Sequence, residues 1–91
     1  HMSKPRKYKL ENIGANQQHM STFEGRYFIS YGKIVVFIDN EGKITLDRTC
    51  WDYSVTTSRY RNKFIGEGIA ETRLKLKSGE YKLANLNGVG A

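Results

Sequence analysis

The chain has 91 residues, of which 38% are hydrophobic, and it carries a formal net charge of +6. This length fits one domain with a modest core, and the hydrophobic fraction argues against wholesale disorder. No apolar run approaches the ~20 residues of a membrane helix. We expect no secretory leader, because no apolar stretch follows the basic start. The single Cys50 excludes an internal disulfide framework.

Residues 1–22 are polar, basic and aperiodic, which predicts a flexible arm. The first two residues look like a cloning remnant that precedes the native start. The alternation of Tyr8 and Leu10 leaves a short strand open as an alternative within this arm. One domain is expected over residues 23–86, and residues 87–91 are expected to fray.

Residues 26–55 predict an antiparallel meander of three to four strands. The strongest strand is 33–39, because almost all of its residues are β-branched or aromatic. The sequence of residues 39–42, Asp-Asn-Glu-Gly, is a hairpin loop signal, and residues 43–47 alternate as a half-buried strand. The alternation continues over residues 50–55. One face of this last segment carries three apolar side chains, Trp51, Tyr53 and Val55.

A short helix is predicted after the meander. Either Thr56 or Thr57 is expected to cap it, because threonine oxygens accept hydrogen bonds from the first amides of a helix. Gly66 is expected to end it in a left-handed conformation. Tyr60 and Phe64 are four residues apart, so both would face the sheet.

The last ordered region alternates strictly over residues 72–83 around a Ser-Gly turn, which predicts a second hairpin. A helix over residues 68–77 is the weaker alternative, because Leu74 would lie off its apolar face. The expected fold is α+β: an antiparallel meander of three to four strands plus a C-terminal hairpin, packed against one short helix. The strand at 33–39 is apolar on both faces, so the uncovered face would meet the arm, the C-terminal segment or another chain.

Residue types that catalysis needs are sparse, so we expect no enzyme, no metal site and no cofactor. His19 lies in the predicted arm, and Cys50 has no ordered histidine to act as its base. Gly66-Glu67-Gly68 lacks the longer pattern of a phosphate loop. Cys50 and Trp51 are therefore expected to be core residues.

The basic element that follows the predicted strands is the candidate functional site. Arg59 and Lys63 are four apart on one helix face, and Arg61 lies nearer the flank. All three oppose the helix dipole, which makes them candidate contacts for phosphate. The hydroxyls at the helix start could also bind phosphate or could merely cap the helix. The predicted nucleic-acid-binding residues are Arg48, Thr57, Ser58, Arg59, Arg61 and Lys63, with Lys4, Arg6 and Lys7 in the arm.

Two motifs resemble a loose group of small phage-encoded proteins: Ser30-Tyr31 and Ser54-Val55-Thr56-Thr57-Ser58-Arg59-Tyr60-x-Asn62. The shared pattern is a Ser-Tyr strand start and then aromatic-Ser-x-Thr-Thr. Next come Ser or Gly, a basic residue, a histidine or aromatic residue, and a nearby Asn. Tyr60 stands where histidine is common, which speaks against a metal-binding role there. The resemblance implies a phage or mobile-element origin and expression inside a bacterial cell, and the group carries no established activity.

Two main hypotheses follow for the function. The first is a non-enzymatic phage accessory protein in the cytoplasm of the host bacterium, which binds nucleic acid through the basic helix and the arm. The second is a protein-binding module that inhibits or redirects a bacterial host protein through Tyr27, Tyr31 and Tyr81. A virion structural or assembly component is a third. None of them involves a membrane, and all leave a homodimer open.

Overall fold

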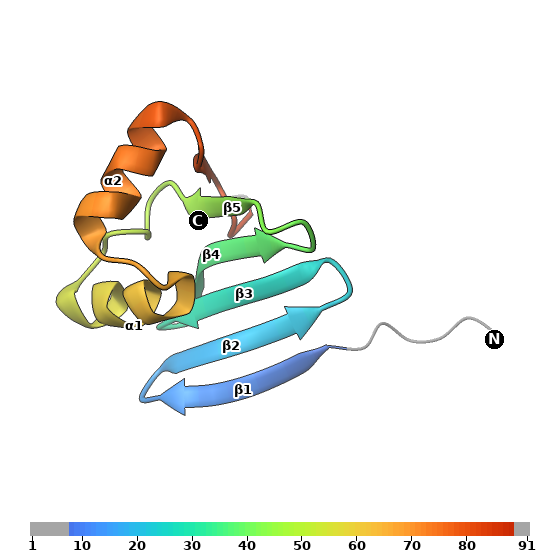
Figure 1. Ribbon diagram of the computed structural model, residues 1–91. Helices are drawn as coiled ribbons and strands as arrows, with labels where there is room; N and C mark the ends of the chain where they lie inside the picture. Colours follow the sequence, from blue (N-terminus) through green and yellow to red (C-terminus); the bar gives the residue numbers. More distant parts are fainter. Residues whose placement is uncertain (1–7, 89–91) are drawn as a thin grey trace.

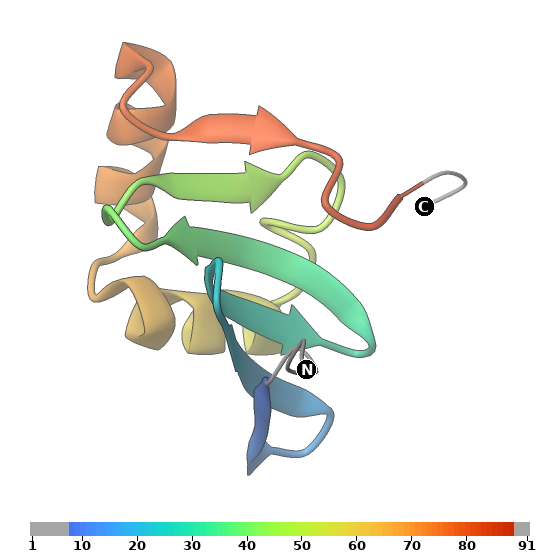
Figure 2. The same ribbon diagram turned by 90° about the vertical axis from the view of Figure 1, so that its right-hand side faces the viewer.

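The computed structural model describes residues 8–88 as a six-stranded sheet with two helices against one face (Figures 1 and 2). The strands are Lys9–Gly14 (β1), Gln17–Thr22 (β2), Gly25–Ser30 (β3), Lys33–Asp39 (β4), Ile44–Asp47 (β5) and Lys82–Ala84 (β6). The helices are Val55–Ile65 (α1) and Ile69–Ser78 (α2). The strands lie side by side in sequence order, antiparallel except for β5 and β6. The predicted α+β class is confirmed.

The core lies between the sheet and the helices. Phe28, Val36 and Leu46 are neighbours in register on three adjacent strands, and all three are fully buried. The ring of Phe64 on α1 lies 5.9 Å from that of Phe28. Tyr60, one turn earlier, also packs against this cluster, so the predicted inward pair on α1 is confirmed. Burial of each large apolar side chain contributes roughly 2 kcal/mol.

The sequence predicts the end of α1 correctly and its start only approximately. Gly66 ends the helix with a φ of 88°, as expected. The N-cap is Ser54, whose Oγ accepts a hydrogen bond from the Thr57 amide at 3.1 Å. Thr57 does not cap the helix because its hydroxyl points inward and lies 2.8 Å from the Ser30 Oγ.

The prediction of a flexible arm over residues 1–22 is wrong for residues 9–22, which form the β1–β2 hairpin (Figure 1). The hairpin is polar, but β2 pairs with β3 along its whole length. Backbone hydrogen bonds to the edge of β3 therefore hold it, together with the His19 ring, which lies 4.8 Å from the Phe64 ring. The cations at Lys4, Arg6 and Lys7 lie outside the described residues.

The predicted strand over residues 50–55 is also wrong, because the chain turns sharply after β5. The Asp47 carboxylate accepts hydrogen bonds from the amides of Thr49 and Cys50, at 3.0 and 2.8 Å, and bends the backbone there. Tyr53 is 67% exposed in the resulting loop. Trp51, in contrast, packs against the core.

The predicted second hairpin is replaced by α2, the weaker alternative, and by β6, which pairs in parallel with β5. Gly68 and Gly79 flank α2 as its caps. The alternating Leu74 does not indicate a strand, because it is 67% exposed on the helix surface. Asn87, predicted to fray, is ordered and forms two hydrogen bonds with the backbone of Ile34.

The sheet face away from the helices also carries apolar side chains, as predicted. Tyr27 and Phe37 are paired in register, and their rings stack at 4.6 Å. Both alternate with side chains that face the helices, so they lie on the opposite face. Leu10 of β1 continues this row through Met20 and is 59% exposed.

Candidate nucleic-acid interface

Arg61 is not available to contact phosphate, because its side chain is completely buried. Its Nη1 donates to the carbonyl oxygen of Trp51 at 2.6 Å, and its Nη2 donates to the Asn62 Oδ1 at 2.9 Å. Burial lowers the pKa of Arg61, and Asp52, 3.5 Å away, acts in the opposite direction. The predicted phosphate contact is therefore wrong. Arg61 instead ties the loop before α1 to the helix.

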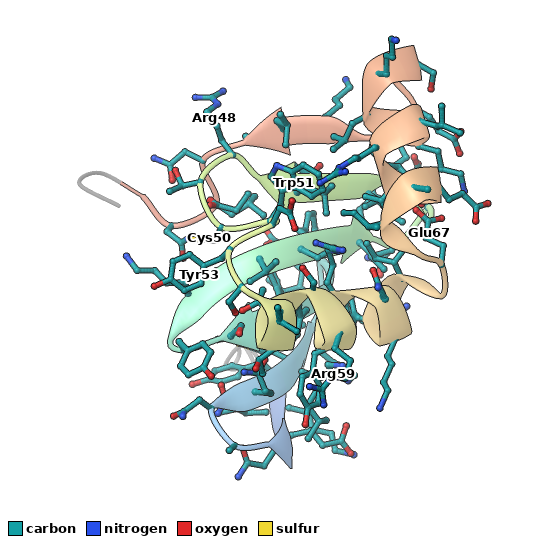
Figure 3. All side chains as sticks on the ribbon, turned by 90° about the vertical axis from the view of Figure 1, so that its left-hand side faces the viewer. Arg48, Cys50, Trp51, Tyr53, Arg59 and Glu67 are labelled. Atoms are coloured by element: carbon teal, nitrogen blue, oxygen red, sulfur yellow. The ribbon has the colours of Figure 1, made fainter. Side chains whose placement is uncertain are left out.

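Arg59 and Lys63 lie on the exposed side of α1, as the sequence predicts. Neither makes an ion pair with a carboxylate within residues 8–88. The Lys63 Nζ lies 5.7 Å from the centre of the Tyr60 ring. Figure 3 shows Arg59 on the side of α1 next to the β1–β2 hairpin. Both cations are thus free to meet an anion from solvent.

Two further cations extend this region, and the sequence did not mark them as candidates. Arg26 of β3 is exposed, and its guanidinium lies 5.2 Å from the centre of the Phe64 ring on α1. Lys9 is in register with Ser21, which is in register with Arg26, so both cations share one sheet face. We call Lys9, Arg26, Arg59 and Lys63 the basic face. The strand register brings Lys9 and Arg26 together on this face. The sequence did not reveal this register, because residues 1–22 were predicted to be a flexible arm.

The other predicted site residues are not brought to the basic face. Arg48 lies in the turn after β5, well away from Arg59 (Figure 3), and its amide donates to the carbonyl oxygen of Ala84 at 2.8 Å. Thr57 is 1% exposed. The Ser58 Oγ donates to the Asp52 Oδ1 at 3.1 Å. The predicted phosphate contact of Thr57 is therefore wrong, because its hydroxyl is buried, whereas Ser58 is only half-buried and its phosphate contact stays a prediction.

A pocket of about 200 Å³ opens beside the N-terminal end of α1. Ser30 and Thr57 line it with their hydroxyl groups, 2.8 Å apart. Tyr31 and Tyr53 line it with rings that are 49% and 67% exposed. Ser30 and Tyr31 belong to one of the two motifs described above, and Tyr53 and Thr57 belong to the other. Motifs more than 20 residues apart thus converge on one pocket.

The ionisable groups of this pocket favour binding over nucleophilic chemistry. Asp47 is 2% exposed, and its carboxylate accepts hydrogen bonds from the amides of Leu86, Thr49 and Cys50. Burial alone raises the pKa of Asp47, but these hydrogen bonds outweigh it and lower the pKa below its ordinary value. Burial and the neighbouring Asp47 raise the pKa of the Cys50 thiol. A thiol that stays protonated near neutral pH is a poor nucleophile.

Comparison with known sequences places the chain in a family. A sequence model described as "Family of unknown function (DUF8033)" matches residues 8–81. The chain belongs to this family. The match includes the whole β1–β2 hairpin and both helices, so the polar hairpin is part of the family's domain. No curated protein and no solved structure matches the chain.

Other kinds of site find little support in the described part of this family member. No three His, Cys, Asp or Glu side chains within residues 8–88 are grouped so that they could hold a metal ion. His19 packs against the rings of Phe28 and Phe64, and burial lowers its pKa. Over the same residues, both helices are too short and too polar to cross a membrane.

Proposed function

We propose that this protein binds nucleic acid through the basic face. One observation carries the proposal: within residues 8–88, none of the four cations of this face is paired with a carboxylate. Glu11 lies on the same side of β1 as Lys9, so the positive charge of the face rests mainly on Arg26, Arg59 and Lys63. Cations of this kind contact the regularly spaced phosphates of a nucleic acid.

The acidic side chains near the helices do not cancel this charge, because they are engaged elsewhere. Asp52 binds Arg61 and, at 3.2 Å, the Nη2 of Arg73. Glu67 binds the Lys75 Nζ at 2.9 Å. Figure 3 shows Glu67 at the junction of α1 and α2, away from Arg59. The carboxylates of Asp52 and Glu67 are therefore paired with other cations, and the side of α1 next to the hairpin keeps its positive charge.

Binding of a fluorescent oligonucleotide, measured by anisotropy over a range of salt concentrations, tests the proposal. For a single strand, the logarithm of the affinity falls with the logarithm of salt by about 0.7 per phosphate contact. The double variant Arg59→Ala/Lys63→Ala should bind more weakly, with a slope reduced by about 1.4. The matched control is Lys77→Ala/Lys82→Ala, which removes two exposed charges outside the basic face. Equal binding by both variants would overturn the proposal.

The proposed setting is a phage accessory protein without enzymatic activity, in the cytoplasm of a bacterial host. The resemblance to small phage-encoded proteins supports the setting, and the protonated thiol of Cys50 supports a binding role. The N-terminal cations at Lys4, Arg6 and Lys7 would add to the positive charge if they reach the same partner.

A protein-binding module that inhibits or redirects a host protein is the second candidate. One observation favours it: Tyr31, Tyr53 and Val55 line a common depression and are 49%, 67% and 80% exposed. Two of the tyrosines predicted for this role are unsuitable, because Tyr81 is only 6% exposed and Tyr27 is stacked on a neighbouring ring. A host protein that is retained from lysate after nuclease treatment, but not by a Tyr53→Ser variant, would favour this candidate.

A further inference from the structure

Tyr31 occupies a backbone position that normally selects another residue type. Its φ is 52° and that of Gly32 is 76°, so both central residues of the two-residue β3–β4 turn are left-handed. Turns of this geometry strongly prefer Asn-Gly, because asparagine tolerates the left-handed region and an aromatic residue does not. In the β1–β2 turn, by comparison, the one left-handed residue is Asn16, at a φ of 60°. The turn itself therefore does not explain Tyr31, and strain of this kind gathers at functional sites.

The ring of Tyr31 lines the 200 Å³ pocket together with the ring of Tyr53. Sites for drug-sized ligands are typically about 300–1,000 Å³, so this pocket suits a single planar ring system. The polar side chains of Ser30, Thr57 and Asn87 also line it, but the two hydroxyls are buried and bonded to each other, and the Asn87 amide is bonded to Ile34 and Asp47, so these groups shape the pocket and leave little to bind a ligand. Recognition of a nucleobase in this pocket would therefore come from stacking, which every base permits, and not from hydrogen bonds to the base edge. Two partly exposed aromatic rings can stack on such a base.

A polar and basic track leads from the pocket to the basic face. Thr56 lines the depression beside Tyr53, at the N-terminal end of α1. Arg59 and Lys63 follow it by three and seven residues, and this spacing places all three on one side of the helix. Lys33, an exposed cation, also lines the pocket. A phosphate backbone could thus be contacted both at the pocket and along α1.

We infer that the pocket binds one unstacked base of a single-stranded nucleic acid, between Tyr31 and Tyr53, while the backbone of the strand follows α1 to Arg59 and Lys63. This inference rests on the proposed function and gives it a substrate class. Duplex DNA keeps its bases paired and stacked, so the protein binds a single strand more tightly than the duplex of the same sequence.

The test compares two short, labelled single strands: one of mixed sequence, and one of equal length in which abasic spacers replace every base. Both carry the same backbone charge, so only the pocket distinguishes them. Wild-type protein should bind the normal strand about tenfold more tightly. The variants Tyr31→Asn and Tyr53→Ser should each lose most of this preference. Tyr8→Ser is the matched control, because Tyr8 is equally exposed at 66% and lies outside the pocket.

Tyr31→Asn separates binding from folding. The substitution supplies the preferred turn residue, so its melting temperature should equal or exceed that of the wild type while the preference for bases falls. Equal binding of the two strands by wild type overturns the base pocket, and the proposed function still stands if Arg59→Ala/Lys63→Ala weakens both. If the tyrosine variants lose the preference for bases and Arg59→Ala/Lys63→Ala has no effect on binding, the base pocket is supported and the proposed role of the basic face is overturned. If wild type binds neither strand, both proposals are wrong.

Discussion

The two helices lie against the same face of the sheet and both carry cations, but Arg73 and Lys75 of α2 are paired with carboxylates, whereas the exposed Arg59 and Lys63 of α1 are not. In α2, the Lys75 Nζ lies 2.9 Å from the Glu67 Oε1 and 3.8 Å from the Glu71 Oε2. In α1, no residue is acidic, and Arg59 and Lys63 form no ion pair within the described chain. Arg59 and Lys63 are thus accessible to an anion from solvent, whereas Lys75 is held in an ion pair.

The electrostatics of the pair around Glu67 support this contrast. Burial alone raises the pKa of Glu67, but hydrogen bonds from Lys75, Thr72 and Tyr81 outweigh it and lower the pKa below its ordinary value. Burial and Glu67 together raise the pKa of Tyr81 to about 12. Lys75 therefore stabilises the fold through its ion pair with Glu67. The functional proposal rests on α1, where the exposed cations have no such partner.

The largest expected effect concerns Arg61, the cation of α1 that points inward. Arg61→Ala should destabilise the protein by about 3 kcal/mol, because it leaves the Trp51 carbonyl oxygen and Asp52 without their buried partner. Each kcal/mol shifts the melting temperature of a domain of this size by about 4–8 °C. Thermal unfolding should therefore show a decrease of more than about 10 °C.

Arg59→Ala is the control for this prediction, because it removes the same side chain from the exposed side of the same helix. Its stability should stay within about 0.5 kcal/mol of the wild type. Equal melting temperatures for Arg61→Ala and Arg59→Ala would contradict the distinction between an inward structural cation and an outward binding cation.

Much of this arrangement follows from local sequence. The β-branched strand at 33–39 and the left-handed end at Gly66 each depend on neighbouring residues, so both are predicted correctly. The position of Arg61 could also have been predicted. It lies four residues after Thr57 and three before Phe64, and both of these face the sheet. The helical period therefore pointed Arg61 inward, whatever its charge.

The parts that were missed depend on distant partners. The β1–β2 hairpin has no apolar pattern of its own, and its stability comes from pairing with β3. The basic face and the pocket are equally hard to predict from local sequence. The basic face depends on strand register, and the pocket depends on the turn at Asp47. In α2, the alternation of Leu74 and Leu76 imitates a strand, although only Leu76 packs against the core.

The next prediction tests Lys75, a cation of α2 that is paired with a carboxylate. Glu67→Gln should cost about 2 kcal/mol at neutral pH, because the ion pair with Lys75 is lost in a site where Glu67 is 6% exposed. The pKa of Glu67 is held below its ordinary value of 4.5, so the carboxylate stabilises the fold above that pH. The contribution is lost as the pH falls through the lower folded-state pKa. Urea unfolding should show that the difference in stability between the variant and the wild type shrinks as the pH falls below 4.5.

The control for this prediction is Glu41→Gln, which removes a carboxylate whose ion pair with Lys43 is exposed on both sides. Its unfolding curves should follow those of the wild type at every pH. A Glu67→Gln variant that remains equally destabilised at low pH would mean that packing around the side chain, and not its charge, holds α2.

The smallest expected effect comes from giving α1 the acidic first turn that α2 has. Val55 is the first residue of α1 and is 80% exposed, so Val55→Glu introduces a charge without disturbing the core. The helix dipole should stabilise the variant by about 0.5 kcal/mol, seen as a small rise in melting temperature. The same charge lies beside the pocket and should weaken oligonucleotide binding by repelling phosphate. Val55→Gln, which is uncharged and similar in size, should bind like the wild type. If Val55→Glu alone raises stability and weakens binding, the first turn of α1 lacks an acidic residue because its partner is an anion. Equal binding by the two variants would mean that the anion binds elsewhere.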